Sequence, residues 1–336
     1  MSRRGARVIA GAAAVVALAV LATLSIARAR YSAAPVRSSA GSVSLAPGPR
    51  LVARSTAPGS DGRLVSVPAG APTGGRAVSS LSCARLYAAG GTGLCLRLDR
   101  GLTTYQLAVL DTRLRTVREI PLVGVPNRAR LSPSGRMAAW TVFVTGDSYN
   151  GGRFSTRAGI LDTRTQELVP TLEDWPVTVA GRPHRAADHN FWGVTFAPDD
   201  RHFYATMSTG GHRYLVSGDM ATHRMRTVRD NVECPSLSPD GTRIAFKSAR
   251  HGDPARGWRL SVLDLATHRV TPLAETRSVD DQATWTDLGT VAYALPRGRG
   301  RADVWAVPAD GTGTPHVLIP DAESPAALGT TDPGAQ

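Results

Sequence analysis

Polar side chains recur at four places in the sequence where a short apolar run is about to begin. They are Asn127 and Arg128, then Asp188, His189 and Asn190, then Glu233 and Cys234, and then Asp280, Asp281 and Gln282. Carboxylates such as Glu233, Asp280 and Asp281 can bind a hard cation such as Ca²⁺, and one whose pKa is raised can act as a general base. His189 is a second candidate base or ligand. The competing interpretation is that these groups cap strands, pair with Arg128 and hold water.

The sequence lacks the common signatures of a catalytic or cofactor site. There is no Gly-x-Ser-x-Gly nucleophile elbow and no His-Glu-x-x-His motif, and Gly90-Gly91-Thr92-Gly93 lacks the Lys of a phosphate-binding loop. We therefore expect no catalytic residues and no cofactor, with Ca²⁺ as the alternative. The expected ligand- or partner-binding residues are Arg128, His189, Asn190, Trp192, Glu233, Asp280, Asp281 and Gln282.

A repeated phrase explains why these groups should converge. The stretch 237–246, Leu-Ser-Pro-Asp-Gly-Thr-Arg-Ile-Ala-Phe, is echoed at 131–140 and 196–205 and in shortened form at 285–293. Each copy predicts a strand, a tight turn and a second strand, because Pro presets φ, Asp bonds its own backbone and Gly accepts a positive φ. A second phrase, typified by Val262-Leu263-Asp264, follows each copy. A unit of four strands in about 45 residues is the period of a propeller blade.

Six blades account for the chain after its first fifty or so residues. Complete units are expected at 82–122, 127–172, 189–230, 232–275 and 279–319, with insertions at 146–153 and 173–187, whereas 51–81 supplies only three strands. Glu323-Ser324-Pro325 echoes Glu233-Cys234-Pro235, which opens a blade, so we predict that the C-terminal segment completes the first blade and closes the ring. The residues before each inner strand then face one mouth of the central channel, where a binding site is expected.

The Ser-Pro-Asp-Gly turn followed by Arg-Ile-Ala-Phe resembles the β-propeller repeat of the TolB family. The chain as a whole resembles the membrane-anchored TolB-like proteins of high-GC actinobacteria, over roughly residues 50–328. This resemblance implies an all-β, six-bladed β-propeller preceded by one N-terminal transmembrane helix. The membrane segment, the repeats and the absence of a nucleophile constellation together favour a non-catalytic protein of the cell envelope that binds a partner.

The N-terminus predicts a membrane segment. Arg3, Arg4 and Arg7 precede an uncharged apolar stretch at 8–27, and about twenty such residues span a bilayer as a helix. We expect a cytoplasmic tip at 1–7, a signal anchor at 8–27, a flexible linker at 28–48, the propeller at 49–328 and a disordered tail at 329–336. Cleavage near the small-x-small sequence at 27–29 is the alternative and would release the protein. In both cases the propeller lies outside the cytoplasm.

Cysteine spacing fits an oxidising compartment. Cys83 and Cys95 bracket a Gly-rich turn between two apolar runs, which predicts a hairpin that brings the two thiols together. We expect a Cys83–Cys95 disulfide and a free Cys234; three reduced thiols are the alternative.

The net charge of +12, from 39 Lys and Arg against 27 Asp and Glu, does not indicate a nucleic-acid partner. Lys247 is the only lysine, and the arginines are scattered without a basic run. The leading interpretation is a monomeric, single-pass, extracytoplasmic propeller that binds an envelope protein or a cell-wall ligand at its funnel face. The alternative is a hydrolase or lyase that uses the mouth carboxylates and His189 on a saccharide or peptide.

Overall fold

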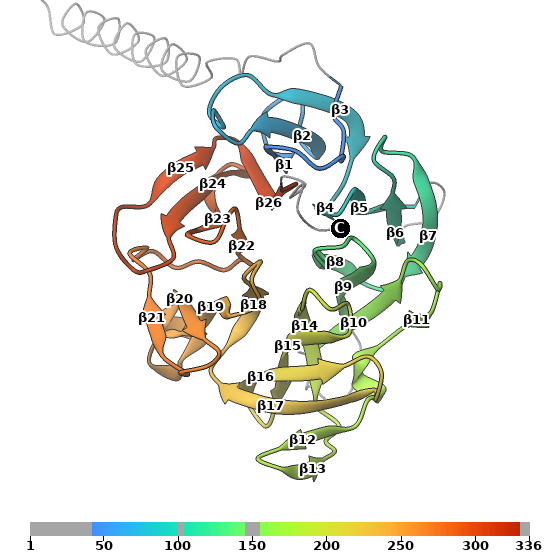
Figure 1. Cartoon of the computed structure of the whole chain (residues 1–336), viewed down its shortest axis with the longest axis vertical. Helices are drawn as coiled ribbons and strands as arrows, with labels where there is room; N and C mark the ends of the chain where they lie inside the picture. Colours follow the sequence, from blue (N-terminus) through green and yellow to red (C-terminus); the bar gives the residue numbers. More distant parts are fainter. Residues whose placement is uncertain (1–41, 100–103, 145–154, 330–336) are drawn as a thin grey trace, which may run out of the picture. The chain divides into compact units, whose positions relative to one another are not determined.

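The repeats form six antiparallel β-sheets, arranged as blades around a central channel in the computed structural model (Figure 1). The structure describes residues 42–99, 104–144 and 155–329. The predicted all-β, six-bladed propeller is confirmed. The predicted tip, membrane segment and most of the linker lie outside the described residues, as does the insertion at 146–153. Within the described ranges, no helix is long and apolar enough to cross a membrane.

The first three blades contain four strands each, numbered below from the channel outward. Blade 1 consists of β26 (Ala322–Ala327), β1 (Arg50–Ser55), β2 (Arg63–Pro68) and β3 (Ala77–Ser82). Blade 2 consists of β4 (Arg85–Ala89), β5 (Thr92–Leu98), β6 (Tyr105–Leu110) and β7 (Thr116–Leu122). Blade 3 consists of β8 (Val125–Leu131), β9 (Met137–Val144), β10 (Ser155–Asp162) and β11 (Leu168–Val169).

The last three blades follow the same order, and blade 4 is widened. Blade 4 consists of β14 (Asn190–Phe196), β15 (His202–Thr209), β16 (His212–Asp219) and β17 (Arg224–Asp230), extended at its outer edge by β12 (Val177–Val179) and β13 (Arg182–His184). Blade 5 consists of β18 (Glu233–Leu237), β19 (Arg243–Ala249), β20 (Trp258–Asp264) and β21 (Val270–Pro272). Blade 6 consists of β22 (Thr284–Trp285), β23 (Thr290–Gly298), β24 (Arg301–Pro308) and β25 (His316–Ile319). Short 3-10 turns occur at Leu172–Asp174, Arg250–Gly252 and Pro254–Arg256.

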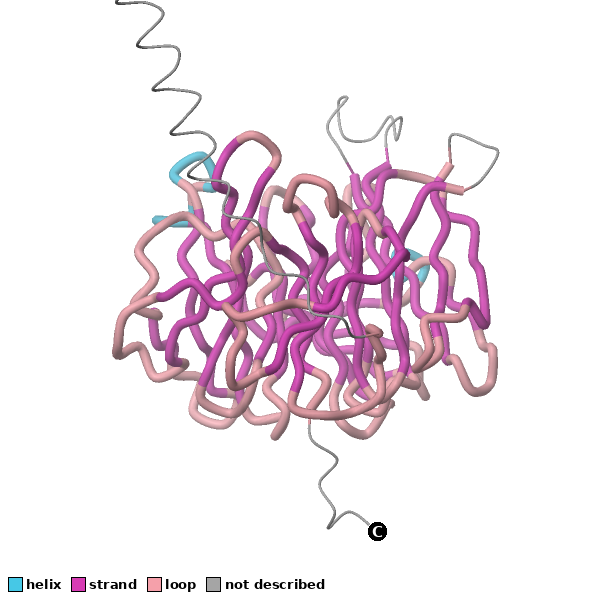
Figure 2. Tube along the Cα trace, turned by 90° about the horizontal axis from the view of Figure 1, so that it is seen from above, coloured by secondary structure: helices cyan, strands magenta, loops and turns pink. Residues whose placement is uncertain are grey.

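The two ends of the channel are built differently. The strands run between two layers of loops (Figure 2). We call the end where the inner strands begin the mouth face, and the end where they turn into the second strands the turn face. On the turn face the repeated phrase forms the predicted turn: Arg243 N donates to Ser238 Oγ at 3.0 Å, Thr242 N donates to Asp240 Oδ1 at 3.2 Å, and Gly241 has φ 71°. The local turn chemistry therefore sets the blade pattern.

The C-terminal strand closes the ring, as predicted. β26 pairs antiparallel with β1, with Leu51 opposite Ala327, and so becomes the inner strand of blade 1. Ionic contacts reinforce the closure. Arg54 Nη1 lies 3.2 Å from Glu323 Oε1, and Asp321 accepts hydrogen bonds from Arg297 and Arg301. Residues at opposite ends of the ring sequence are thereby joined in one sheet.

The packed unit begins earlier than the predicted boundary at residue 49. Leu45 has no exposed surface and Val43 is also buried, both in a cluster with residues of blades 1 and 2. Leu45 N donates to Thr112 O at 2.9 Å, and Gly48 N donates to Gly329 O. The linker sequence looked polar and aperiodic, but these two apolar side chains fix its last part to the ring.

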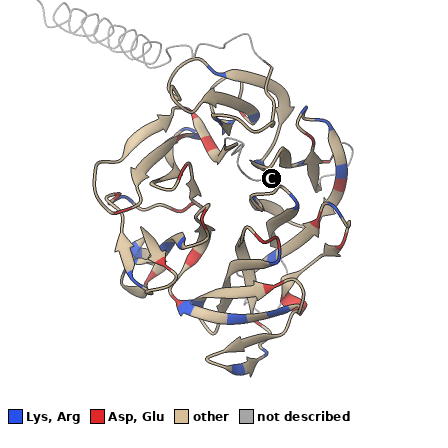
Figure 3. Cartoon of the chain, viewed as in Figure 1, with Lys and Arg blue, Asp and Glu red and all other residues tan. Residues whose placement is uncertain are grey.

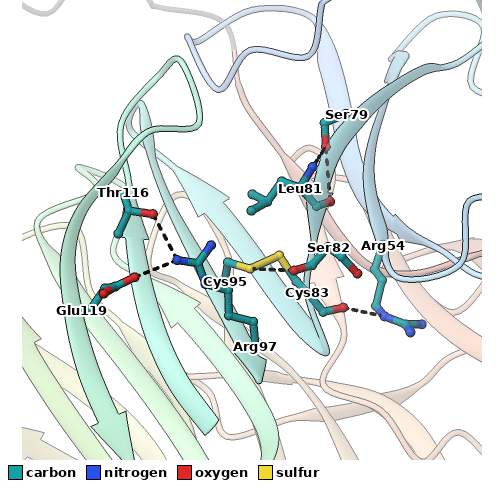
Figure 4. The surroundings of a disulfide bond; sticks show 9 residues. All are labelled: Arg54, Ser79, Leu81, Ser82, Cys83, Cys95, Arg97, Thr116 and Glu119. Carbon is teal, nitrogen blue, oxygen red and sulfur yellow. Dashed lines mark hydrogen bonds and ion pairs between the residues drawn. A yellow bond between two sulfur atoms is a disulfide. The ribbon is translucent and has the colours of Figure 1, made fainter. Parts of the chain in front are cut away.

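The predicted disulfide is confirmed. Cys83 and Cys95 are joined, and Cys234 is free and buried. Cys83 lies in the crossover from blade 1 to blade 2, and Cys95 lies on β5 (Figure 4). Arg54 Nε donates to the Cys83 carbonyl oxygen at 2.8 Å, which links the crossover to β1 as well. The disulfide therefore fixes the crossover from blade 1 to blade 2 against β5 of blade 2.

Candidate functional site

A cavity of about 620 Å³ opens at the mouth face, where the inner strands begin. Three of these strands carry an irregularity at this point: the pairing register shifts between Pro126 and Arg128 on β8, between Trp192 and Thr195 on β14, and near Cys234 on β18. A bulge bends the strand and re-aims the side chains beside it. The mouth residues therefore depend on departures from regular strand geometry.

Five of the eight expected site residues line this cavity: Arg128, Asn190, Trp192, Glu233 and Asp280. They come from four different segments: β8, β14, β18 and the loop before β22. Asn127 and Cys234 lie beside them in the same cavity. The convergence follows from the ring, because each inner strand starts at the same end of the channel.

The other three expected residues hold neighbouring segments in place. His189 Nε2 bonds the backbone oxygen of Glu173 at 2.8 Å, and its ring lines a separate cavity beside the insertion. Asp281 Oδ2 accepts from Ala294 N at 3.0 Å. Gln282 Nε2 donates to Val194 O and to Pro235 O, at 3.1 and 2.9 Å, and so ties blades 4 and 5 to the start of blade 6.

A buried carboxylate and a lysine dominate the electrostatics of the cavity. Glu233 is 3% exposed; its Oε1 lies 2.7 Å from Arg213 Nε, and its Oε2 lies 3.9 Å from Lys247 Nζ. Lys247 also pairs with Asp280 and lies 4.1 Å above the Trp258 ring. Burial raises the pKa of Glu233 to about 7, although the two neighbouring cations act in the opposite direction. Two of the three carboxylates considered for Ca²⁺, Glu233 and Asp280, are therefore engaged by protein cations.

Among the described cations that line the cavity, Arg128 alone has no carboxylate partner. Its Nη1 donates to Asn127 O at 3.1 Å and Oδ1 at 2.7 Å, and its Nη2 donates to Asp280 O at 3.4 Å. Its buried Nε has no partner within the described ranges, where no carboxylate oxygen lies within 4.0 Å of the guanidinium either. Burial alone would lower the pKa of Arg128. The neighbouring Cys234, Asp281 and Asp280 outweigh burial, so the pKa is raised. A fully charged guanidinium thus faces the cavity with hydrogen-bonding capacity left over.

Lys247, Arg213 and Trp258 complete the site but were not among the expected residues. They lie on β19, β16 and the start of β20, so they belong to second and third strands rather than inner ones. One signal was available, because Lys247 is the only lysine of the sequence and follows directly after the repeated Arg-Ile-Ala-Phe. By contrast, basic residues as a class gave no signal, since arginines are spread over all the blades (Figure 3).

Comparisons with known proteins identify the fold. No protein-family model matches the sequence, and no curated protein matches it. Among solved structures, TolB from Acinetobacter baumannii is similar with a TM-score of 0.59 and 17% identity, over 84% of this chain and 67% of that chain. A chain of a nidogen/laminin complex is similar with a TM-score of 0.52 and 12% identity, over 82% of this chain and 97% of that chain. The chain therefore has a TolB-like propeller fold, which confirms the resemblance seen in the repeated phrase.

Proposed function

We propose that this protein is a membrane-tethered, extracytoplasmic binding protein that holds an anionic group of an envelope protein or wall polymer in its mouth cavity. The observation that carries the proposal is Arg128, a guanidinium at the cavity whose described partners are all uncharged. An arginine in this state favours a carboxylate or phosphate ligand, because its planar donors match those groups. The tether is the apolar segment 8–27.

The surroundings of Arg128 favour a large partner over a small solute. Trp192 and Trp258 are partly exposed in the cavity wall, and aromatic side chains of this kind are enriched in binding interfaces. Val123, in the crossover from β7 to β8, and Val125, the first residue of β8, are 80% and 54% exposed. These valines border the start of β8 on the mouth face. An apolar rim beside a charged pocket fits a docked macromolecule whose anionic group enters the pocket.

Site-specific photocrosslinking in native membranes tests this proposal. A photoreactive phenylalanine analogue replaces Val125 on the mouth face, and in the matched control it replaces Leu288, which is 52% exposed in a turn-face loop. We expect a discrete adduct at position 125 and none at 288. Protease or muramidase digestion of the adduct then assigns it to a protein or to wall polymer.

Arg128→Met provides the decisive comparison. The adduct should fall at least about tenfold, because a charge-assisted hydrogen bond is lost. The exposed Arg118→Met serves as the control variant and should leave the adduct unchanged. Equal adducts at 125 and 288, or an adduct at 125 that persists in Arg128→Met, would contradict a ligand held at the mouth.

A second candidate function, hydrolysis or lyase chemistry on a saccharide or peptide, is favoured by Glu233. Its pKa of about 7 suits a general acid or base. His189 does not join it, because its ring faces the cavity at the insertion. Glu233→Gln separates the two functions: an enzyme should lose turnover of cell-wall oligosaccharides or peptides by about 100-fold or more, whereas a binding protein should keep its Arg128-dependent adduct and show no turnover to lose.

A further inference from the structure

A second arginine lies deeper in the channel, two residues along β8 from Arg128. Alternate residues of a strand point to the same side, and Arg130 accordingly lines the channel between the mouth and the turn face. Unlike Arg128, it is almost wholly buried, at 4% exposed. A guanidinium therefore sits at the centre of the ring, away from bulk water.

The partners of Arg130 are all uncharged. Its Nη2 donates to Ala283 O at 2.9 Å, its Nη1 lies 3.5 Å from Thr284 Oγ1, and its guanidinium carbon lies 4.3 Å from the centre of the Tyr87 ring. Its Nε has no hydrogen-bond partner, and none of the carboxylates in the described ranges lies within 4.0 Å of it. A buried charge without a counterion is costly, and proteins normally pair it. The described residues thus supply Arg130 with hydrogen-bond acceptors and an aromatic ring but with no counterion.

A cavity of about 210 Å³ adjoins Arg130 on the turn-face side. Among the described residues that line it, Arg130 is the single charged one. Most of its wall is apolar or aromatic, including Leu131, Phe196, Trp285 and Leu328. Its edge reaches solvent at Pro133 and Gly329, which are exposed. The cavity combines one buried positive charge with an apolar chamber and an opening.

We infer that this chamber, which we call the Arg130 chamber, binds a small organic monocarboxylate. The carboxylate pairs with the guanidinium of Arg130, and the apolar body of the ligand packs against the chamber wall. The size agrees, because an apolar cavity of about 150 Å³ accommodates benzene, and the chamber is somewhat larger. This site is separate from the mouth cavity and does not depend on the function proposed for it.

Fluorine NMR of the full-length protein tests the inference, with 4-fluorobenzoate as the probe and the neutral 4-fluorobenzamide as its matched control. We expect saturable broadening of the benzoate signal and at least tenfold weaker binding of the amide. Arg130→Met should weaken benzoate binding about 10- to 100-fold. Arg128→Met at the mouth and the exposed Arg118→Met should leave it unchanged.

Absence of saturable binding to the wild-type protein would overturn the inference, as would equal binding of benzoate and benzamide. Binding lost in Arg128→Met but kept in Arg130→Met would also overturn it, by placing the probe in the mouth cavity. If Arg130→Met fails to fold, Ala89→Phe tests whether the probe binds in the chamber. Ala89 lines the chamber, so the larger side chain fills it while Arg130 remains in place. Loss of benzoate binding in a folded Ala89→Phe supports the chamber, and unchanged binding refutes it.

Discussion

The Cys83–Cys95 disulfide should contribute a measurable share of the stability of the ring. The bond closes a loop with a sequence separation of 12. In the chain-entropy model, a loop of that length corresponds to about 2.8 kcal/mol at 25 °C. For a unit of about 280 residues with an unfolding entropy of about 2.1 cal/mol/K per residue, this lowers the melting temperature by about 5 °C. The double variant Cys83→Ala and Cys95→Ala removes the bond and tests this expected decrease in melting temperature.

Thermal unfolding followed by circular dichroism measures the effect. The wild-type protein in a reducing agent is the matched control, because it loses the covalent link and keeps both side chains. The denatured, unreduced wild type should have one reactive thiol, that of Cys234. Three reactive thiols, or a reduced wild type that melts at the same temperature as the oxidised protein, would refute the assignment of a stabilising bond.

Three further predictions concern the way the ring is assembled and buried. Deletion of the residues after Pro320 removes β26 and its pairing with β1, so the melting temperature should fall sharply, and an unchanged melt would refute the closure. Leu45→Ala should lower the free energy of unfolding, measured with urea, by about 2–5 kcal/mol, because the side chain is fully buried. A change near zero would show that this segment belongs to the linker and not to the packed ring. Burial raises the pKa of Glu173 to about 7 from 4.5, so the folded protein holds a proton that the unfolded chain releases, and stability should fall as the pH rises through that window. In Glu173→Gln the unfolding free energy should decline less between pH 5 and pH 8 than in the wild type, and an identical decline would contradict the assignment.

The blades could be predicted from the sequence because their defining chemistry is local. A Pro, an Asp and a Gly within one turn fix the backbone there, as at Asp240 and Gly241, and the same turn recurs at the blade period. The closure of the ring by the C-terminal strand could also be predicted, since Glu323-Ser324-Pro325 resembles Glu233-Cys234-Pro235 at the start of blade 5. Leu45 was missed because two apolar residues in a polar stretch carry no periodicity, and only the ring reveals what they contact.

The site was harder to predict because its residues come from different depths of the blades. The inner-strand positions Arg128, Asn190 and Glu233 follow from the ring geometry alone. Lys247 and Trp258 reach the mouth from strands farther out, and their placement depends on the neighbouring side chains. For His189 the contact with Glu173 O in the insertion accounts for the orientation, and this contact has no sequence signature.

The pairing of β26 with β1 also determines which blade is completed last as the chain is synthesised. β1 and its partner are separated by nearly the whole ring in sequence, with a separation of 269 between the hydrogen-bonded Arg54 and Glu323. The first blade therefore lacks its inner strand until residues 322–327 have been synthesised. A chain that ends before residue 322 carries the strands of the other five blades and lacks the strand that closes the ring.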